Sequence, residues 1–369
     1  MKMLQRSLLS LLMIISVIMG VPHLQGSNHL FSFNSIAHST ELVRKSAAQP
    51  AVTAVASIGM TVSNLDQALD FYTRVLTFKQ VSDVEVLGSE FEQLNGLFGV
   101  RLRVVKLQLG DEFIELTEYL TPKGRQIPTD SRSHDRWFQH IAIVVRDMDQ
   151  AYQHLRQYNV QHTSTAPQRI PKTNPVAAGI QAFYFKDPDG HNLEVIYFPP
   201  GKGEPKWQKP TEQLFLGIDH TAIGVSHTAQ SLTFYRDVLG LKLAGESLND
   251  GIEQAHLNLV EGARLHISGL RAATGPGVEF LEYLEPQDGR SLPYPQSSIS
   301  PAIARPNDVV YWQTTVVVND IKRLFQRLSR NRSTFISTNI IPMPEQVLGF
   351  KQGVIIRDPD GHAIQLVEK

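Results

Sequence analysis

Alternating apolar and polar positions, followed by apolar residues at helical spacing, recur along the chain and predict repeated copies of one structural unit. The first copy begins with the alternating stretch Ser57 to Ser63, which predicts a strand, and continues with helical spacing from Leu65 to Leu76. The same succession returns from His220 to Gly240. Asn64 and Thr228 stand where the two predicted helices begin, and both residue types cap helix N-termini.

A second kind of unit also occurs twice. Each copy opens with an alternating strand, at His140–Val145 and at Gln313–Val318, and an Asp and a helical stretch follow each strand. Each copy closes with Asp-Pro-Asp-Gly-His, at 187–191 and 358–362, before a last strand. Asp opens a type I turn, Pro fixes the next φ angle and Gly closes the turn.

The units run in the order A, B, A′, B′, near residues 54–122, 137–198, 215–286 and 308–369. The alternating runs after each helix predict three further strands, so each unit is a βαβββ module. The expected fold class is α+β: four modules paired in tandem, with curved mixed sheets that form barrel-like cavities. We expect modules A and B within 51–200, a linker at 201–213 and modules A′ and B′ within 214–369.

The N-terminus predicts export. Lys2 and Arg6 precede an apolar run, Leu8 to Val21, which is as long as a signal-peptide core and short for a membrane span. The sequence therefore predicts a signal peptide over 1–26, a flexible segment over 27–50, and a periplasmic or secreted protein. An uncleaved N-terminal membrane anchor is the alternative.

The composition of the chain limits the kinds of molecule that it is expected to bind. The chain has 35 Lys and Arg against 36 Asp and Glu, so no field of one sign favours nucleic acid or, beyond the signal segment, an anionic membrane. A small molecule is the expected partner, and monomer and homodimer remain open. The absence of Cys excludes disulfides, thiolate nucleophiles and Cys-bound metals, so any metal must be held by His, Asp, Glu or Gln.

Two motifs carry a family resemblance. The opening strand with a helix ending in Phe-Tyr-x-x-Val-Leu, and the closing Asp-Pro-Asp-Gly-His-x-(Leu/Ile)-(Glu/Gln) strand, resemble the vicinal oxygen chelate superfamily of glyoxalases, bleomycin-resistance proteins and extradiol dioxygenases. The resemblance covers residues 54–369. It implies that each module offers two metal-facing positions, one on its first strand and one on its last. These are Ser57 and Glu115 in A, His140 and Glu194 in B, His220 and Glu279 in A′, and Gln313 and Gln365 in B′.

Strand periodicity supports these positions independently. His140 shares a strand face with Ala142 and Val144, while the intervening Ile and Val residues point the other way. Glu194 and Glu279 also alternate with apolar neighbours. A carboxylate on the concave side of a sheet is costly unless it is paired, exposed or bound to a cation.

The pairing of the modules decides which ligands meet. If A combines with B, and A′ with B′, both ligand sets are mixed. If B combines with A′, then His140, Glu194, His220 and Glu279 form one complete metal site. The set of A and B′ then has lost most of its metal ligands, since it consists of Ser57, Glu115, Gln313 and Gln365. We favour this crossed pairing because the good ligands are concentrated in B and A′. Two imidazoles and two carboxylates suit one divalent transition metal such as Fe, Ni, Zn, Mn or Co, and they match the pattern of bacterial-type glyoxalase I.

Three functions follow from the resemblance. The first is a metal-dependent isomerase or lyase of the glyoxalase type, in which Glu194 or Glu279 moves a proton on a substrate chelated through adjacent oxygens. The second is an extradiol-type ring-cleaving dioxygenase with Fe(II), whose ligand positions would fall on His220, Gln313 and Gln365. The third is a non-catalytic small-molecule binder of the bleomycin-resistance type.

Several residues outside the ligand sets have two interpretations. Arg125 and Arg290, which follow the A-type ligand strands, either clamp a carboxylate or are solvated loop charges. His191 and His362 are expected at the rim as turn-end residues. Trp137 and Trp312 either line a pocket mouth or cover the end of a barrel.

Overall fold

The structure, a computed structural model, describes residues 51–292 and 303–369. The predicted signal peptide and the 27–50 segment lie outside these residues. Four modules of the predicted type are present. Module A comprises β1 (Val52–Thr61), α2 (Leu65–Asp70) continued by the π-helical turn η1 (Phe71–Val75), β2 (Lys79–Leu87), α3 (Ser89–Asn95), β3 (Arg101–Leu109) and β4 (Glu112–Thr121). Module B comprises β5 (Gln139–Val145), α4 (Met148–Gln157), β6 (Gln161–His162), β7 (Gln168–Arg169), β8 (Gln181–Lys186) and β9 (Asn192–Tyr197).

The second half repeats this plan. Module A′ comprises β10 (Phe215–Gly224), α5 (Thr228–Leu232) continued by η3 (Thr233–Val238), β11 (Lys242–Asn249), α6 (Gly251–Asn258), β12 (Arg264–Arg271) and β13 (Gly277–Glu285). Module B′ comprises β14 (Trp312–Val318), α7 (Ile321–Arg330), β15 (Ile341–Pro342), α8 (Glu345–Leu348), β16 (Gln352–Arg357) and β17 (Ala363–Glu368). A 3-10 turn, η2 (Pro205–Gln208), lies between the halves. The predicted α+β class with curved mixed sheets is confirmed.

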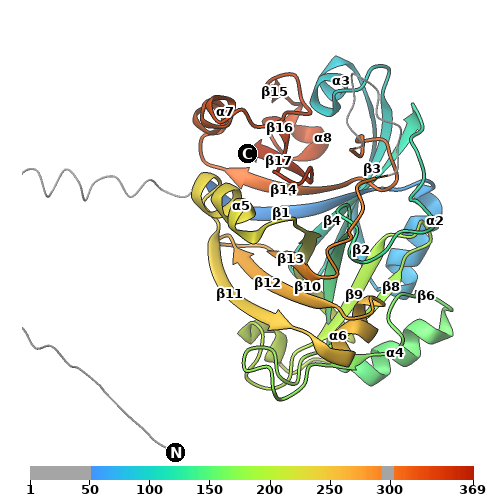
Figure 1. Ribbon diagram of the computed structural model, residues 1–369. Coiled ribbons are helices and arrows are strands. Elements are labelled where there is room, and N and C mark those ends of the chain that lie inside the picture. The colour runs from blue at the N-terminus through green and yellow to red at the C-terminus, as the bar shows by residue number, and fades with distance from the viewer. Residues whose placement is uncertain (1–50, 293–302) are drawn as a thin grey trace, which may run out of the picture. The chain divides into compact units, whose positions relative to one another are not determined.

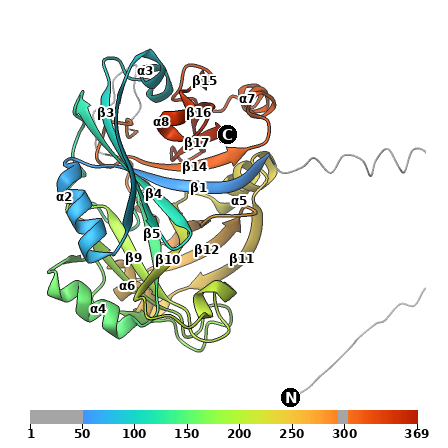
Figure 2. The ribbon, with the colours of Figure 1, turned by 180° about the vertical axis from the view of Figure 1, so that it is seen from behind.

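The strand order shows that the modules pair crosswise. One sheet has the order β15-β16-β17-β14-β1-β4-β3-β2 and joins B′ to A, whereas the other has the order β11-β12-β13-β10-β5-β9-β8-β6 and joins A′ to B. In Figure 1 the blue β1 accordingly lies beside the orange β14, and Figure 2 shows the same neighbours from behind. The strands of residues 51–200 are therefore divided between the two sheets.

Each crossed pair is joined by one antiparallel ladder between opening strands. In the sheet of B and A′, β5 pairs with β10, and Ala142 lies opposite His220 while His140 lies opposite Ala222. The closing strand β9 runs parallel to β5, with Glu194 beside Ala142, and β13 runs parallel to β10, with Glu279 beside Ala222. This register brings the predicted ligand positions of both modules to the centre of one sheet.

The Phe-Tyr-x-x-Val-Leu motif of each A-type module contacts the Asp-Pro-Asp-Gly-His turn of the B-type module that follows it in the sequence. The hydroxyl of Tyr72, from Phe-Tyr-x-x-Val-Leu in A, donates to Asp187 of the turn in B at 3.1 Å. The equivalent Tyr235 of A′ donates to Asp358 in B′ at 3.0 Å. Each module thus shares a sheet with one partner and a buried tyrosine–aspartate hydrogen bond with another.

The helix starts are capped by side chains in most modules. Asn64 accepts a hydrogen bond from the backbone N–H of Gln67 at 3.0 Å, as expected of an N-cap. The expected cap Thr228 is instead the first helical residue, and His227 before it makes no side-chain cap bond. The N–H of Thr228 donates to Glu282 of β13 at 3.2 Å, so a neighbouring strand satisfies this helix end.

Arg125 and Arg290 clamp carboxylates of the protein itself. Arg125 Nε donates to Asp308 at 2.9 Å and thereby ties A to B′. Arg290 Nε and Nη2 donate to the two oxygens of Asp135 at 3.0 and 2.7 Å and tie A′ to B. Both Asp side chains are buried, so the clamps support the crossed pairs and are not free to hold a substrate.

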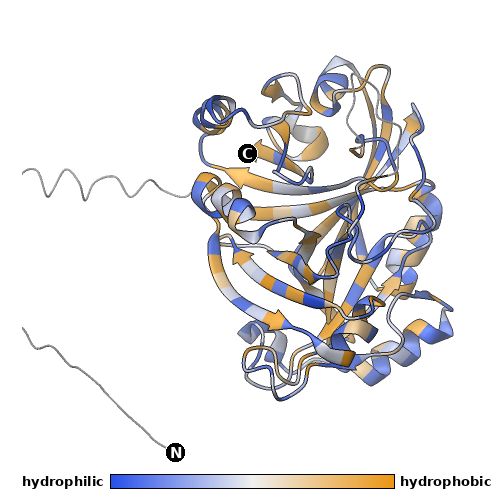
Figure 3. Ribbon diagram, viewed as in Figure 1, coloured by the Kyte–Doolittle hydropathy of each residue, from blue (hydrophilic) through white to orange (hydrophobic). Residues whose placement is uncertain are grey.

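The hydrophobic core fills the space between helices and sheets. Central strands are buried on both faces, and β5 is buried along its whole length. Outer strands alternate, as the orange and blue segments of the lower strands in Figure 3 show. Among the described residues, none of the helices combines the length and hydrophobicity needed to cross a bilayer.

Candidate metal centre

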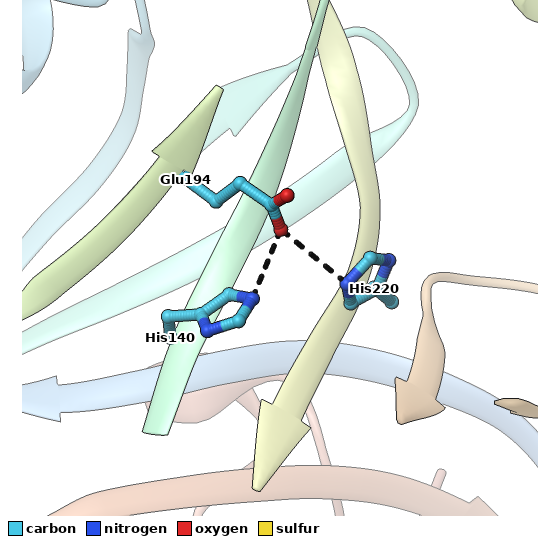
Figure 4. Close-up of side chains that lie close together, drawn as sticks. All are labelled: His140, Glu194 and His220. Atoms are coloured by element: carbon cyan, nitrogen blue, oxygen red, sulfur yellow. Dashed lines mark hydrogen bonds and ion pairs between the residues drawn. The ribbon is translucent and has the colours of Figure 1, made fainter. Parts of the chain in front are cut away.

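Three predicted ligands converge where β5, β9 and β10 meet. His140 Nε2 lies 3.0 Å from Glu194 Oε2, and His220 Nε2 lies 3.6 Å from the same oxygen. One ligand atom from each residue lies within 4.8 Å of the others. Figure 4 shows both imidazoles pointing toward the Glu194 carboxylate. All three side chains are buried, so the cluster is an interior polar group that needs compensation.

The fourth predicted residue, Glu279, stands at the edge of this cluster. Its Oε1 lies 3.5 Å from His220 Nε2, and its side chain is 24% exposed. Glu194 contacts both histidines, whereas Glu279 pairs with His220. Glu279 is therefore the more accessible and less constrained of the two carboxylates.

Asp219 orients His220 from behind, and the sequence pattern did not predict this role. Asp219 Oδ2 lies 2.9 Å from His220 Nδ1, so the other ring nitrogen, Nε2, faces the cluster. Strict alternation would place Asp219 and His220 on opposite faces of β10. A register shift between Ile218 and His220 interrupts the ladder at this point and allows the contact. The adjacent Asp-His pair is visible in the sequence, but the bulge is not.

The carboxylate of Asp219 is itself held by two side chains. Trp207 Nε1, from the turn η2, donates to Oδ1 at 3.0 Å, and Arg271 Nη2 from β12 contacts Oδ2 at 2.8 Å. A Cβ at Gly217 would lie 2.8 Å from the Trp207 ring and would also meet Glu112, so a larger residue would displace this support. The predicted linker thus contributes directly to the surroundings of the site.

Tyr184 is a second residue that the sequence did not reveal. It lies opposite Glu194 in the β8–β9 ladder, and its ring centroid is 4.8 Å from that of His140. Burial raises the pKa of Tyr184 well above its usual value, and the nearby Glu194 and Glu279 add to the effect. The phenol therefore keeps its proton beside the cluster.

Acidic side chains outnumber fixed positive charges around the candidate ligands. Burial raises the pKa of Glu279; the nearby charge of His220 opposes this shift, and the charge of Glu194 reinforces it. Burial opposes the charged form of His220, but Glu279, Asp219 and Glu194 outweigh it and raise its pKa to about 9. Three carboxylates thus share one interior region with Arg271 as the fixed cation. This arrangement favours a bound cation.

The donor atoms fit a divalent transition metal. His220 Nε2 is buried and has no hydrogen-bond partner among the described residues, although it points at two carboxylates. An imidazole fixed through Nδ1 by a carboxylate, with Nε2 free, is the arrangement by which histidines ligate metals. His140 Nε2, Glu194 and Glu279 complete a set of two nitrogens and two carboxylates.

The equivalent positions in A and B′ have a different chemistry. Gln313 Nε2 donates to the side-chain oxygen of Gln365, so these amides bind each other. Glu115 is paired with Lys106 at 3.8 Å. Ser57 replaces the histidine, and the register shift before it contains Ala56, where β10 has Asp219. The set in A and B′ therefore lacks both imidazoles and the supporting carboxylate.

His191 does not lie at the rim as expected, whereas His362 is only partly buried. His191 is fully buried and bridges Asp187 and the carbonyl of Val309, at 2.8 and 2.7 Å. The side chain of His362 is 7% exposed and contacts Asp358 at 3.1 Å. The turn motif places both residues after the Gly, but only the contact with Val309 of module B′ explains the burial of His191.

Comparison with known proteins agrees with this arrangement. The sequence model of the family described as Glyoxalase/Bleomycin resistance protein/Dioxygenase superfamily matches residues 54–195 and 217–366. The chain is 34% identical over 159 residues to a 2-epi-5-epi-valiolone epimerase from Actinomyces sp, which covers 41% of this chain and 83% of that protein. It is also similar to the crystal structure of glyoxalase I from Zea mays, with 15% identity, a TM-score of 0.54, and coverage of 87% of this chain and 92% of that chain. At that identity the structural likeness shows the fold alone.

Proposed function

Because the chain belongs to the Glyoxalase/Bleomycin resistance protein/Dioxygenase superfamily, we propose that it is a metal-dependent enzyme that moves a proton on a small substrate. The metal ligands would be His140, Glu194, His220 and Glu279. The observation that carries the proposal is the convergence of His140, Glu194 and His220 from two modules within 4.8 Å. The epimerase relative supports the reaction class, since a carbon centre next to a carbonyl can be epimerised by removal and return of its proton.

The ion would supply Lewis acidity to two adjacent oxygens of the substrate. The chain supplies the proton transfer. Glu279 is the better base because it is partly exposed and its pKa is raised by burial, so its carboxylate binds a proton more readily than an exposed one. Glu194 is fixed between two imidazoles and would serve as a ligand only. The protonated phenol of Tyr184 can donate a hydrogen bond at the same site.

Apolar side chains lie beside the candidate ligands. Phe138 lies beside His140, with ring centroids 5.5 Å apart, and belongs to an apolar cluster on this face of the sheet. An apolar wall of this kind lowers the local polarity and strengthens the electrostatic effect of nearby charged groups on a bound substrate. The dioxygenase alternative is less well supported, because two of its three ligand positions are Gln313 and Gln365, which bind each other.

The test is proton exchange at carbon. Small ketones with an adjacent hydroxyl or carbonyl oxygen would be incubated in D₂O with the metal-loaded protein, and loss of the C–H signal followed by NMR. We expect metal-dependent exchange for at least one compound, and a decrease of roughly 100-fold or more in the Glu279→Gln variant. A matched control is Glu115→Gln, the equivalent position in A, which should keep the activity.

Other results would support the alternatives. Oxygen consumption with catechols in the presence of Fe(II) would indicate the ring-cleaving reaction. Tight small-molecule binding without bound metal or exchange would indicate the non-catalytic binder. Either outcome would contradict the proposal.

A further inference from the structure

A cavity between the loops of the two sheets contains none of the four candidate ligands. Its volume is about 280 Å³. Its apolar lining consists of Trp137, Leu292, Ile303, Val310, Tyr311 and Trp312. The cavity is large enough for a small aromatic molecule.

His362 gives this cavity a polar group without a partner. The residue lines the cavity, its side chain is 7% exposed, and its Nδ1 lies 3.1 Å from Asp358. The other ring nitrogen, Nε2, is buried and has no hydrogen-bond partner among the described residues. Burial opposes the charged ring, but Asp358 outweighs it and raises the pKa of His362, which favours the charged form. In that form Nδ1 donates to Asp358, and Nε2 carries a second proton that needs an acceptor.

The equivalent histidine of module B shows what is missing. His191 uses Nδ1 in the same way, toward Asp187, but its Nε2 donates to the carbonyl of Val309 at 2.7 Å. The cavity beside it has a volume of about 10 Å³. In module B, therefore, both ring nitrogens of the turn histidine have partners and almost no cavity lies beside it. In module B′ the cavity is open and Nε2 has no partner among the described residues. A ligand that accepts a hydrogen bond from His362 Nε2 would give the two histidines the same number of partners.

The charges around His362 favour an anionic acceptor. Arg136 lines the cavity, is exposed, and makes no side-chain hydrogen bond or ion pair with the described residues. Arg357 also lines it and donates to the carbonyl of Gly361 at 2.6 Å. The carboxylate of Asp360 accepts from the N–H of Ser226 at 3.2 Å and offsets one of the two arginines. One positive charge remains for a ligand.

We propose that this cavity binds a small carboxylate with a flat apolar body, independently of the metal centre. The carboxylate accepts the hydrogen bond of His362 Nε2 and lies near Arg136. The apolar body packs against the indole rings of Trp137 and Trp312, which line the cavity. An aromatic carboxylate combines both requirements in one small molecule.

Benzoate is the probe for the test, and tryptophan fluorescence is the readout, because two of the three Trp residues line the cavity. The full chain is titrated with benzoate, and calorimetry gives the stoichiometry. We expect saturable binding at one site. In His362→Asn the amide can replace Nδ1 toward Asp358 but nothing replaces Nε2, so the dissociation constant should rise roughly tenfold or more. Arg136→Gln, a surface change that spares the fold, should raise it about two- to fivefold.

Matched controls locate the site. His191→Asn, in the closed copy of the turn, and His220→Ala, at the metal centre, should keep the wild-type affinity. Benzyl alcohol, which has the same ring without the charge, should bind much more weakly. The proposal is overturned if wild type shows no saturable benzoate binding, if benzyl alcohol binds equally well, or if His220→Ala abolishes binding while Arg136→Gln has no effect.

Discussion

His140 and His220 face each other from neighbouring strands of two different modules, with ring centroids 5.8 Å apart. Their strands are joined by the β5–β10 ladder, so the distance between the rings depends on the crossed pairing of B with A′. No single module provides both imidazoles. The candidate metal centre therefore requires the second half of the chain to complete the first.

Replacing His220 by Ala should abolish high-affinity metal binding, whereas Gln365→Ala should leave it nearly unchanged. His220 supplies an imidazole at the complete set, and Gln365 is bonded to Gln313 in the other set. Loss of an outer-sphere partner typically lowers metal affinity by about 10–100-fold, so loss of a ligand should be at least as severe. Elemental analysis should give one metal per chain for wild type and for Gln365→Ala. Two metals per chain, or equal damage from both changes, would show that the Gln-containing set also binds metal.

Replacing Asp219 by Asn should weaken metal binding by roughly 10–100-fold without abolishing it. The carboxylate of Asp219 fixes the ring of His220 and increases its electron donation, and an amide keeps the shape without the charge. Competition with a fluorescent chelator measures the affinity. Ala56→Asp, the equivalent position beside Ser57, is the control and should create no new site. Unchanged affinity in Asp219→Asn would show that the contact is structural only.

Replacing Arg290 by Ala should destabilise the fold by about 1–2 kcal/mol. Asp135 would lose its contacts with Nε and Nη2 but would keep Arg132 and backbone donors, which limits the damage. Urea denaturation measures the change. Arg125→Ala, which removes the equivalent contact with Asp308, should have a similar effect. A neutral result for both variants would mean that these loops do not stabilise the crossed pairs.

The stability of the fold should fall between about pH 6.5 and 8 because of His191. Burial opposes its charge, but Asp187 outweighs it and raises the pKa of His191 to about 8. A group whose pKa is raised by folding stabilises the protein fully below its unfolded pKa, and that contribution is lost as the pH rises through the folded pKa. The contribution is about 2 kcal/mol.

The measurement is the unfolding free energy at several pH values, with chelator present so that metal binding does not contribute. His191→Asn should show a smaller decrease between pH 6 and 9 than wild type. An identical pH dependence in both proteins would rule out a charged His191 in the folded state.

Much of the architecture could be predicted from periodicity and repeats. Strand alternation placed His140 and Glu194 on one face, where the structure has them, and the repeat offset related His140 to Gln313. Pairing between modules was a choice between alternatives, because a repeat does not show which copies share a sheet. The structure decided it through the β1–β14 and β5–β10 ladders.

The rest depends on contacts between distant segments. Asp219 supports His220 only because a bulge interrupts alternation, and single-sequence patterns do not reveal bulges. Trp207 lies in a segment that composition marked as a linker, yet its indole reaches Asp219. His191 is buried because a loop of B′ covers it, 118 residues later in the chain.

The crossed pairing also determines the order in which the two sheets can form while the chain is being synthesised. The sheet that holds the candidate metal centre has all its strands once Glu285 has left the ribosome, whereas β1 finds its partner β14 only when Val318 has emerged. At translation rates of about 5–20 residues per second, module A waits on the order of tens of seconds with one edge of β1 unpaired. An open edge in a nascent chain is a target for wrong strand pairing. A chaperone that binds module A during this interval would therefore increase the yield of folded protein, even though module A contributes no ligand to the centre.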